Sequence, residues 1–352
     1  MPMLNVSSPH AHRPLSTRHV MQLVILATLP GVLALTVFFG WGTLINLAIA
    51  IPLALGFEAV VLTLRKRPVG FYLSDYSAML TAVLLAIALP PYSPFWLILV
   101  GIFFAIIIAK HLYGGLGYNP FNPAMVAYVV LLISFPVEMT RWAAPLISTT
   151  GAAIDAPDLL IGIQQAFMTT TLDAAYPDGW TMATPLDVLK NNNSELVTDL
   201  FANNSGFGKW AGLGWEWVNL GFLVGGGFLL HKRVFTWHAP VAMLVTLAFC
   251  SLFFYDGGSS ASKGSPLFHL LSGATMFGAF FIITDPVTST VSNRGRLVYG
   301  ALIGLTLFII RSWGNYPDAL AFAVLLMNFA APFIDHYTQP RTYGHNTHSG
   351  AR

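Results

Sequence analysis

The sequence predicts an all-α integral membrane protein with about ten transmembrane helices in two inverted five-helix repeats. Three observations support this fold class: an apolar composition, a series of apolar runs, and an internal repeat. Of the 352 residues, 55% are hydrophobic and only 9% are charged, and the mean hydropathy is +0.66. One soluble core cannot bury that much apolar surface, so much of it must face lipid.

Composition also excludes several kinds of site. The single cysteine, Cys250, lies in an apolar run, so the chain by itself forms neither an internal disulfide nor a thiolate cage for zinc or an iron–sulfur cluster. The histidines show no helical pair at ligand spacing, so we expect no metal site. The net charge of +2 carries little information in a membrane protein. The lipid bilayer is the expected partner, and nucleic acid is not.

Ten apolar runs are long enough to cross a bilayer, or nearly so once tilted. They begin near residues 20, 43, 76, 95, 124, 217, 236, 267, 297 and 317. The first run is too long for a removable signal peptide and lacks a small-residue cleavage site. The predicted parts are a cytoplasmic segment at 1–19, a first five-helix repeat at 20–137, an external loop at 138–214, a second five-helix repeat at 215–335 and a cytoplasmic tail at 336–352.

Lysine and arginine predict the orientation. With the amino terminus in the cytoplasm, the positive-inside rule holds at every short loop, and both termini are cytoplasmic. The cytoplasmic side then carries Arg13, Arg18, Arg65, Lys66, Arg67, Lys110, Lys232, Arg233, Arg294, Arg296, Arg341 and Arg352. The outside keeps Arg141, Lys190, Lys209, Lys263 and Arg311.

An internal repeat, offset by 194 to 195 residues, relates the two halves. Six identities fall in thirteen positions: Pro123, Ala127, Val130, Leu131, Leu132 and Phe135 recur as Pro317, Ala321, Val324, Leu325, Leu326 and Phe329. Because five helices are an odd number, the second half must enter the membrane the opposite way round. The alternative is that apolar helices resemble one another by composition alone.

Inverted repeats place broken helices and ligand sites near their pseudo-two-fold axis. The proline-rich segments at 119–123 and 284–286 are the predicted breaks. Proline removes a backbone donor, and the side chains of Asn119, Asn122 and Asp285 can cap the freed helix ends or face a buried ligand. The alternative is a set of helix ends at the cytoplasmic surface.

Residues 178–184 carry the pattern D-x-x-[ST]-x-A-T, formed by Asp178, Thr181, Ala183 and Thr184. Flavin transferases recognise this pattern when they join the phosphate of FMN to a threonine hydroxyl as a phosphodiester. Pro185 disfavours the helical conformation at Thr184 and pushes it toward an extended one with its hydroxyl available. We therefore expect Thr184 to accept FMN, and we assign no catalytic side chain. The alternative is an ordinary loop threonine.

With its setting, this motif resembles the D subunit of the Rnf (Rsx) ion-translocating electron transport complex, a cousin of the B subunit of sodium-translocating NADH:quinone oxidoreductase. The resemblance covers nearly the whole chain, including segments 113–125 and 284–289, although Met182 replaces the commoner glycine of the motif. A similar motif ends at 272–275 but has His269 in place of the aspartate. We expect 272–275 to lie within the eighth helix as small packing residues.

The resemblance implies a bacterial inner-membrane complex that passes electrons between ferredoxin and NAD(H) and couples the transfer to ion movement. It implies other membrane, flavin or iron–sulfur subunits as partners, a flavin transferase for maturation, and a periplasmic flavin loop. It further implies covalent FMN on Thr184 and a second, non-covalent flavin such as riboflavin, for which Asn119, Asn122 and Asp285 are candidates. The chain is not expected to be an active enzyme alone.

Glu58, in the second predicted helix, is a candidate for an ion pathway, because an intramembrane acid is a functional hypothesis by default. The competing interpretation is a protonated or arginine-paired glutamate that reaches toward the interface. Asp75 is expected to cap a helix. Trp210, Trp215 and Trp217 are expected to form an interfacial aromatic belt.

Two other functions stay open. Inverted five-helix repeats are a transport architecture and urea channels resemble this plan, so a channel or permease without redox activity is the alternative; such a protein needs no flavin motif. A structural anchor for partner subunits predicts that Thr184 is dispensable. Fold alone does not separate these functions. The apolar stretch near 157–170 is expected to form a short surface helix beside the flavin.

Overall fold

A computed structural model describes residues 16–146, 158–167, 181–192, 195–260, 262–314, 316 and 320–338. Within these ranges the regular elements are helices, apart from two isolated bridges that pair Ala143 with Thr181 and Phe207 with Gly212. The all-α prediction is confirmed. The predictions for Asp178, Pro317 and the two ends of the chain fall outside the described residues.

The first half is built from helices that coincide with the first five apolar runs. They are α1 (Thr17–Phe39), α2 (Gly42–Leu64), the short α3 (Val69–Leu73), α4 (Ser77–Ala88), α5 (Phe95–Ile102) with its π-helical continuation η1 (Phe103–His111), α6 (Pro123–Ser134) and the short α7 (Pro136–Thr140). Between the halves lie the short helices α8 (Leu159–Phe167), α10 (Pro185–Asn191) and α11 (Val197–Asn203).

The second half begins after α11. Its helices are α12 (Trp215–His231), α13 (His238–Phe253), α14 (Pro266–Leu271), α15 (Thr275–Phe277) with its π-helical continuation η2 (Gly278–Ile282), α16 (Asn293–Trp313) and α17 (Leu320–Thr338). Within the described ranges, four helices are long and apolar enough to cross a membrane: α1, α2, α16 and α17. The chain is a multi-pass membrane protein, while ten spans and an inverted repeat stay predictions.

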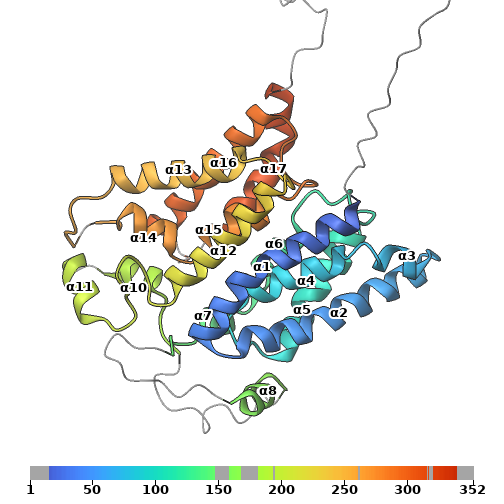
Figure 1. Cartoon of the computed structure of the whole chain (residues 1–352), viewed down its shortest axis with the longest axis horizontal. Helices are drawn as coiled ribbons and strands as arrows, with labels where there is room; N and C mark the ends of the chain where they lie inside the picture. Colours follow the sequence, from blue (N-terminus) through green and yellow to red (C-terminus); the bar gives the residue numbers. More distant parts are fainter. Residues whose placement is uncertain are drawn as a thin grey trace, which may run out of the picture.

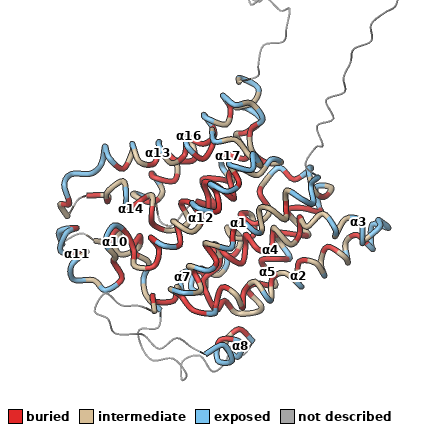
Figure 2. Tube along the Cα trace, viewed as in Figure 1, coloured by how far each residue is buried: buried red, intermediate tan, exposed pale blue. Residues whose placement is uncertain are grey.

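The halves meet along two helix pairs, α1 with α12 and α6 with α17 (Figure 1). Glycines in α12 permit the closest of these approaches, because a Cβ atom at Gly225 would collide with the carbonyl oxygen of Ala27 on α1. Buried residues concentrate where the halves pack together, and α3 and α8 are largely exposed (Figure 2).

The chain's described ends share one side of the molecule. The start of α1 and the end of α17 lie away from α7, α10 and α11 (Figure 1). We call the side that bears these two helix ends the terminal end, and the side that bears α7, α10 and α11 the loop end.

One prediction about the second half is wrong. Residues 272–274 do not continue a helix: α14 ends at Leu271, Ser272 is extended, and Gly273 adopts a positive φ of 57° before α15 begins at Thr275. Glycine takes this left-handed conformation without the steric cost that other residues carry. Gly273 therefore marks a break in the chain and is not a packing position within a continuous helix.

A side chain from α12 satisfies the backbone groups that this break frees. Asn219 Nδ2 donates to the carbonyl oxygens of Leu271 and Gly273 at 3.0 Å each, and its Oδ1 accepts from the amide of Met276 at 3.0 Å. Unpaired backbone groups are costly away from water, so these bonds stabilise the break.

The glycine-mediated contact between α1 and α12 predicts a matched pair of variants. Gly225→Ala should destabilise the protein by about 1–3 kcal/mol, because the added methyl group overpacks the helix contact. Gly227→Ala, in the same helix, should be tolerated, since a Cβ atom there meets nothing within 4 Å. The measurement is the temperature at which detergent-purified protein loses its monodisperse chromatographic peak. Equal behaviour of the two variants would contradict this account of the helix contact.

Candidate functional site

The predicted acceptor, Thr184, stands at the start of α10. Its backbone is extended, with φ −64° and ψ 151°, as predicted from the following Pro185. Its Oγ1 donates to Oδ2 of Asp187 at 2.6 Å and accepts from the Asp187 amide at 3.3 Å. This pairing resembles a capping box and fixes the hydroxyl at the helix start.

Contacts on both sides hold the Thr184 segment. The Met182 amide donates to the Trp142 carbonyl at 3.0 Å, which ties the segment to the chain that follows α7. On the other side, Leu186 and Leu189 are buried in a small core with Phe268. We call this small core the loop-end core. The α10 helix is therefore packed between the helical bundle and the loop-end core.

Lys190 ties the end of α10 to the second half. Its Nζ donates to the Tyr316 carbonyl oxygen at 2.9 Å. Burial lowers the pKa of Lys190 below its usual range, and the negative charge of Asp187 opposes that shift. A cationic group therefore lies one turn beyond Asp187 on the same helix.

The two other motif residues that the structure describes, Thr181 and Ala183, lie at the surface. Asp178 is outside the described residues. Thr181 is exposed and pairs with Ala143 across a bridge. Ala183 is exposed and lines an open groove on the loop-end surface, together with Asp187. These positions suit recognition from outside the protein.

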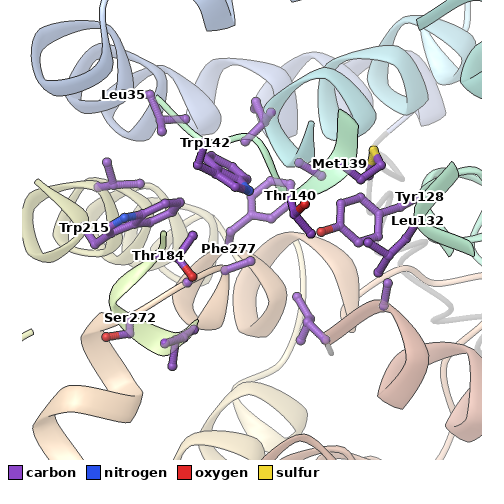
Figure 3. A pocket seen from close by; sticks show the side chains of 18 of the residues that line it. Leu35, Tyr128, Leu132, Met139, Thr140, Trp142, Thr184, Trp215, Ser272 and Phe277 are labelled. Carbon is purple, nitrogen blue, oxygen red and sulfur yellow. The ribbon is translucent and has the colours of Figure 1, made fainter. Parts of the chain in front are cut away.

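A cavity of about 80 Å³ lies on the inner side of Thr184, between the two halves. Figure 3 shows Thr184 beneath the rings of Trp142 and Trp215, with Phe277 beside them. The two indole rings meet edge-on, with centroids 4.9 Å apart. The further lining comes from α1, α4, α6, α7, α12, the 272–274 break and α17, and includes Leu35, Ile87, Met125, Tyr128, Leu132, Met139, Thr140, Phe222, Ser272, Gly273, Leu320 and Ala321.

The chemistry of this lining fits a flavin. The walls are largely apolar and aromatic, which suits the faces of a flat conjugated ring. The Ser272 hydroxyl lines the cavity and is buried without a hydrogen-bond partner among the described residues, so it is available to a polar ring edge.

Sequence reasoning missed most of this lining. Trp215 is only 8% exposed and faces the cavity, whereas Trp210 and Trp217 are 46% and 58% exposed. Trp215 is therefore not part of the expected aromatic belt, which stays a prediction for Trp210 and Trp217. Trp142 carried no sequence signal as a binding residue, and Ser272 was interpreted as a small packing residue.

A second cavity, of about 260 Å³, lies toward the terminal end of the interface between the halves. It brings together Asn119, Asn122 and Asp285, as the proline-rich breaks predicted. Its charged and hydroxyl lining also includes Ser77, Thr81, Lys110, Arg233, Thr236, Thr284, Ser289 and Arg296.

The predicted break residues cap helices and loops as well as lining the cavity. Asn122 Oδ1 accepts from the amides of Ala124 and Met125 at the start of α6. The carboxylate of Asp285 accepts from the Val287 amide. These side chains therefore cap their segments and line a cavity, while a ligand in that cavity stays a prediction.

Three phenylalanine rings lie between the two cavities. Phe222 and Phe277 line the first cavity and Phe281 lines the second. Their ring centroids are 5.0 Å apart for Phe222 and Phe277, 5.7 Å for Phe222 and Phe281, and 6.0 Å for Phe277 and Phe281. The cavities are thus neighbours separated by a layer of rings.

Glu58 is 2% exposed and is paired. Its Oε1 accepts from Nζ of Lys110 at 2.7 Å and lies 3.2 Å from Nε2 of His111. Lys110 also donates to Oγ of Ser77 at 2.8 Å. The Ser77 amide, at the start of α4, donates to Oδ1 of Asp75, so Asp75 caps this helix as predicted. The partners of Glu58 are a lysine and a histidine rather than an arginine, and the carboxylate does not reach the surface.

α8 confirms the expected short helix at the surface. Its Gly162 and Ala166 are buried against Ile45 of α2 and Tyr92, which lies between α4 and α5. Its location beside the flavin site stays a prediction.

The chain is similar to known proteins along nearly its whole length. A model of the NQR2, RnfD, RnfE family matches residues 4–344. A protein of Cellvibrio japonicus (strain Ueda107) is 55% identical over 348 residues, 98% of this chain and 96% of its own length. Proteins of Ectopseudomonas mendocina (strain ymp) and Vibrio atlanticus (strain LGP32) are 58% and 56% identical, covering 98% and 96% of this chain and 97% and 98% of their own lengths. All three are named as the D subunit of an ion-translocating oxidoreductase complex.

The buried Glu58–Lys110 pair predicts a non-additive stability effect. Lys110→Met should cost about 3–5 kcal/mol, because it leaves a buried carboxylate without its main partner. The double variant Glu58→Gln/Lys110→Met should be less destabilised than Lys110→Met alone. Thermal denaturation in detergent measures both, with the exposed Lys66→Met as the control. Additive losses would contradict the pairing.

Proposed function

Because the chain belongs to the NQR2, RnfD, RnfE family, we propose that it is the membrane subunit of an ion-translocating oxidoreductase complex and relays electrons between ferredoxin and NAD(H) through an FMN joined to Thr184. The observation that carries the proposal is the setting of Thr184. The acceptor of the flavin-attachment pattern lies at the edge of a cavity walled by Trp142 and Trp215.

Each part of the first cavity has a task under this proposal. Thr184 holds the flavin phosphate, the indole rings of Trp142 and Trp215 flank the ring system, and the Ser272 hydroxyl bonds its polar edge. When bound, FMN accepts two electrons together and releases them singly. The protein's contribution is to fix the position of the flavin at the junction of the two halves.

The second cavity is the proposed site of a non-covalent flavin such as riboflavin. Asn119, Asn122 and Asp285 supply donors and acceptors there, and the wall is otherwise mixed apolar and cationic. The rings of Phe222 and Phe277, which line the first cavity, contact the ring of Phe281, which lines the second, an arrangement that suits two redox centres placed in sequence.

The proposed orientation puts the loop end in the periplasm and the terminal end in the cytoplasm of a bacterial inner membrane. Arginine and lysine follow the ends of α2 and α12 that lie on the terminal side, in agreement with the positive-inside rule. Glu58 is the proposed acid of an ion pathway, since its partner Lys110 lines the second cavity. Further subunits of the complex and a flavin transferase complete the expected partners, and the chain is proposed to be inactive alone.

Covalent flavin at Thr184 is the first test. Full-length protein co-expressed with a flavin transferase should show a band that fluoresces yellow-green under ultraviolet light on a denaturing gel. Thr184→Val should abolish the fluorescence because it removes the hydroxyl. Thr140→Val, which alters the same cavity outside the motif, should keep it. A dark wild-type band would favour the channel or permease of urea-channel-like architecture, and a fluorescent Thr184→Val band would place the flavin elsewhere.

The position of the ring gives a separate prediction. An indole in contact with an excited flavin quenches its fluorescence by donating an electron, so natively folded protein should fluoresce weakly. Trp142→Leu should raise native fluorescence, whereas Trp210→Leu, at an exposed position on the loop end, should not. The readout is fluorescence per covalent flavin before and after denaturation. Equal ratios in all three proteins would place the ring outside the first cavity.

A further inference from the structure

One carboxylate, that of Asp187, holds the Thr184 hydroxyl. The distance from Thr184 Oγ1 to Asp187 Oδ2 is 2.6 Å, and the Asp187 amide donates back to Oγ1 at 3.3 Å. Asp187 lies outside the flavin-attachment pattern, which ends at Thr184. Its contact is nevertheless with the one side-chain atom that must react when a flavin is attached.

Attachment to phosphorus makes a chemical demand on that atom. A threonine hydroxyl is a weak nucleophile near neutral pH, and an adjacent base activates it by taking its proton. A general base must lie within about 2.6–3.2 Å of the atom that it deprotonates. Asp187 Oδ2 meets this requirement at 2.6 Å before any transferase has bound.

We propose that Asp187 is the general base that activates Thr184 for flavin attachment, an inference that rests on the proposed function. In this step Thr184 Oγ1 forms a bond to the phosphorus of a flavin nucleotide phosphoanhydride, such as flavin adenine dinucleotide. The phosphoanhydride P–O bond breaks, and the leaving nucleotide, AMP, departs with the electron pair. The proton moves from Oγ1 to Asp187 Oδ2, and the oxidation state of the flavin does not change.

The location of Asp187 suits this role. Its side chain lines both the inner cavity beside Thr184 and the open groove on the loop-end surface. The groove is where a soluble transferase meets the exposed Ala183 of the recognition pattern. The base therefore stands between the surface that the transferase approaches and the cavity that receives the ring.

The charges also balance through the step. The product phosphodiester is an anion beside Asp187, and a carboxyl group that has just taken a proton is neutral and does not repel it. After that proton is lost, Lys190, three residues further along α10, supplies a cation near the carboxylate. Attachment thus replaces the hydroxyl–carboxylate bond without leaving two unbalanced anions.

Asp187→Asn separates this role from simple helix capping. The asparagine amide keeps an oxygen that accepts a hydrogen bond from Thr184, but it cannot take a proton at neutral pH. Asp187→Glu keeps the carboxylate on a longer side chain. Asp199→Asn is the matched control, because it removes the same charge from the first turn of the neighbouring helix α11, where the side chain is exposed.

The test is the initial rate of flavin attachment to purified full-length protein at neutral pH, using flavin transferase and flavin adenine dinucleotide, read as in-gel fluorescence. We expect Asp187→Asn to slow attachment by about 100-fold. Asp187→Glu should recover much of the rate, and Asp199→Asn should match the wild type.

The outcomes are distinguishable. An Asp187→Asn protein that is labelled at the wild-type rate overturns the role of Asp187 and leaves covalent flavin at Thr184 intact. A slow Asp187→Asn protein that is not rescued by Asp187→Glu shows that a carboxylate at this position does not set the rate, and it also overturns the role. A wild type that takes no label at Thr184 overturns the proposed function itself.

Discussion

Backbone groups that leave a helix within a membrane find no water to bond, and this constraint governs the centre of the second half. The break at 272–274 persists because Asn219, which is fully buried, bonds the carbonyl oxygens and the amide that the break releases. The same break places the Ser272 hydroxyl and the Gly273 backbone on the wall of the first cavity. One asparagine on α12 thus supports both the local fold and the shape of the site.

Close packing between helices is the second constraint on the structure. Because Gly225 lacks a side chain, α12 approaches the backbone of α1 and the two halves form one continuous core. The cavities lie along that junction, so neither half contains a complete site. Thr184, which belongs to the connecting segment, reaches the junction because α10 is anchored to the loop-end core through Leu186 and Leu189.

The buried charges of Glu58 and Lys110 are paired with each other. The Glu58–Lys110 pair is buried and extends through Ser77 to the cap at Asp75. Desolvation makes such a pair poor evidence for stability, but loss of one partner is costly. Lys110 therefore has two roles: it neutralises Glu58 in α2, and it contributes a positive charge to the second cavity.

The sequence alone determined the features that depend on local pattern. Apolar runs identified the helices, Pro185 determined the extended backbone of Thr184, and Asp75 capped a helix as expected, because each depends on residues a few positions apart. The tertiary structure decided what depends on distant contacts. Glu58 and Lys110 are 52 residues apart. The burial of Trp215 at the cavity and the break at Gly273 depend on contacts with neighbouring helices. Periodicity records which positions are apolar, but only packing selects the neighbour that each side chain meets.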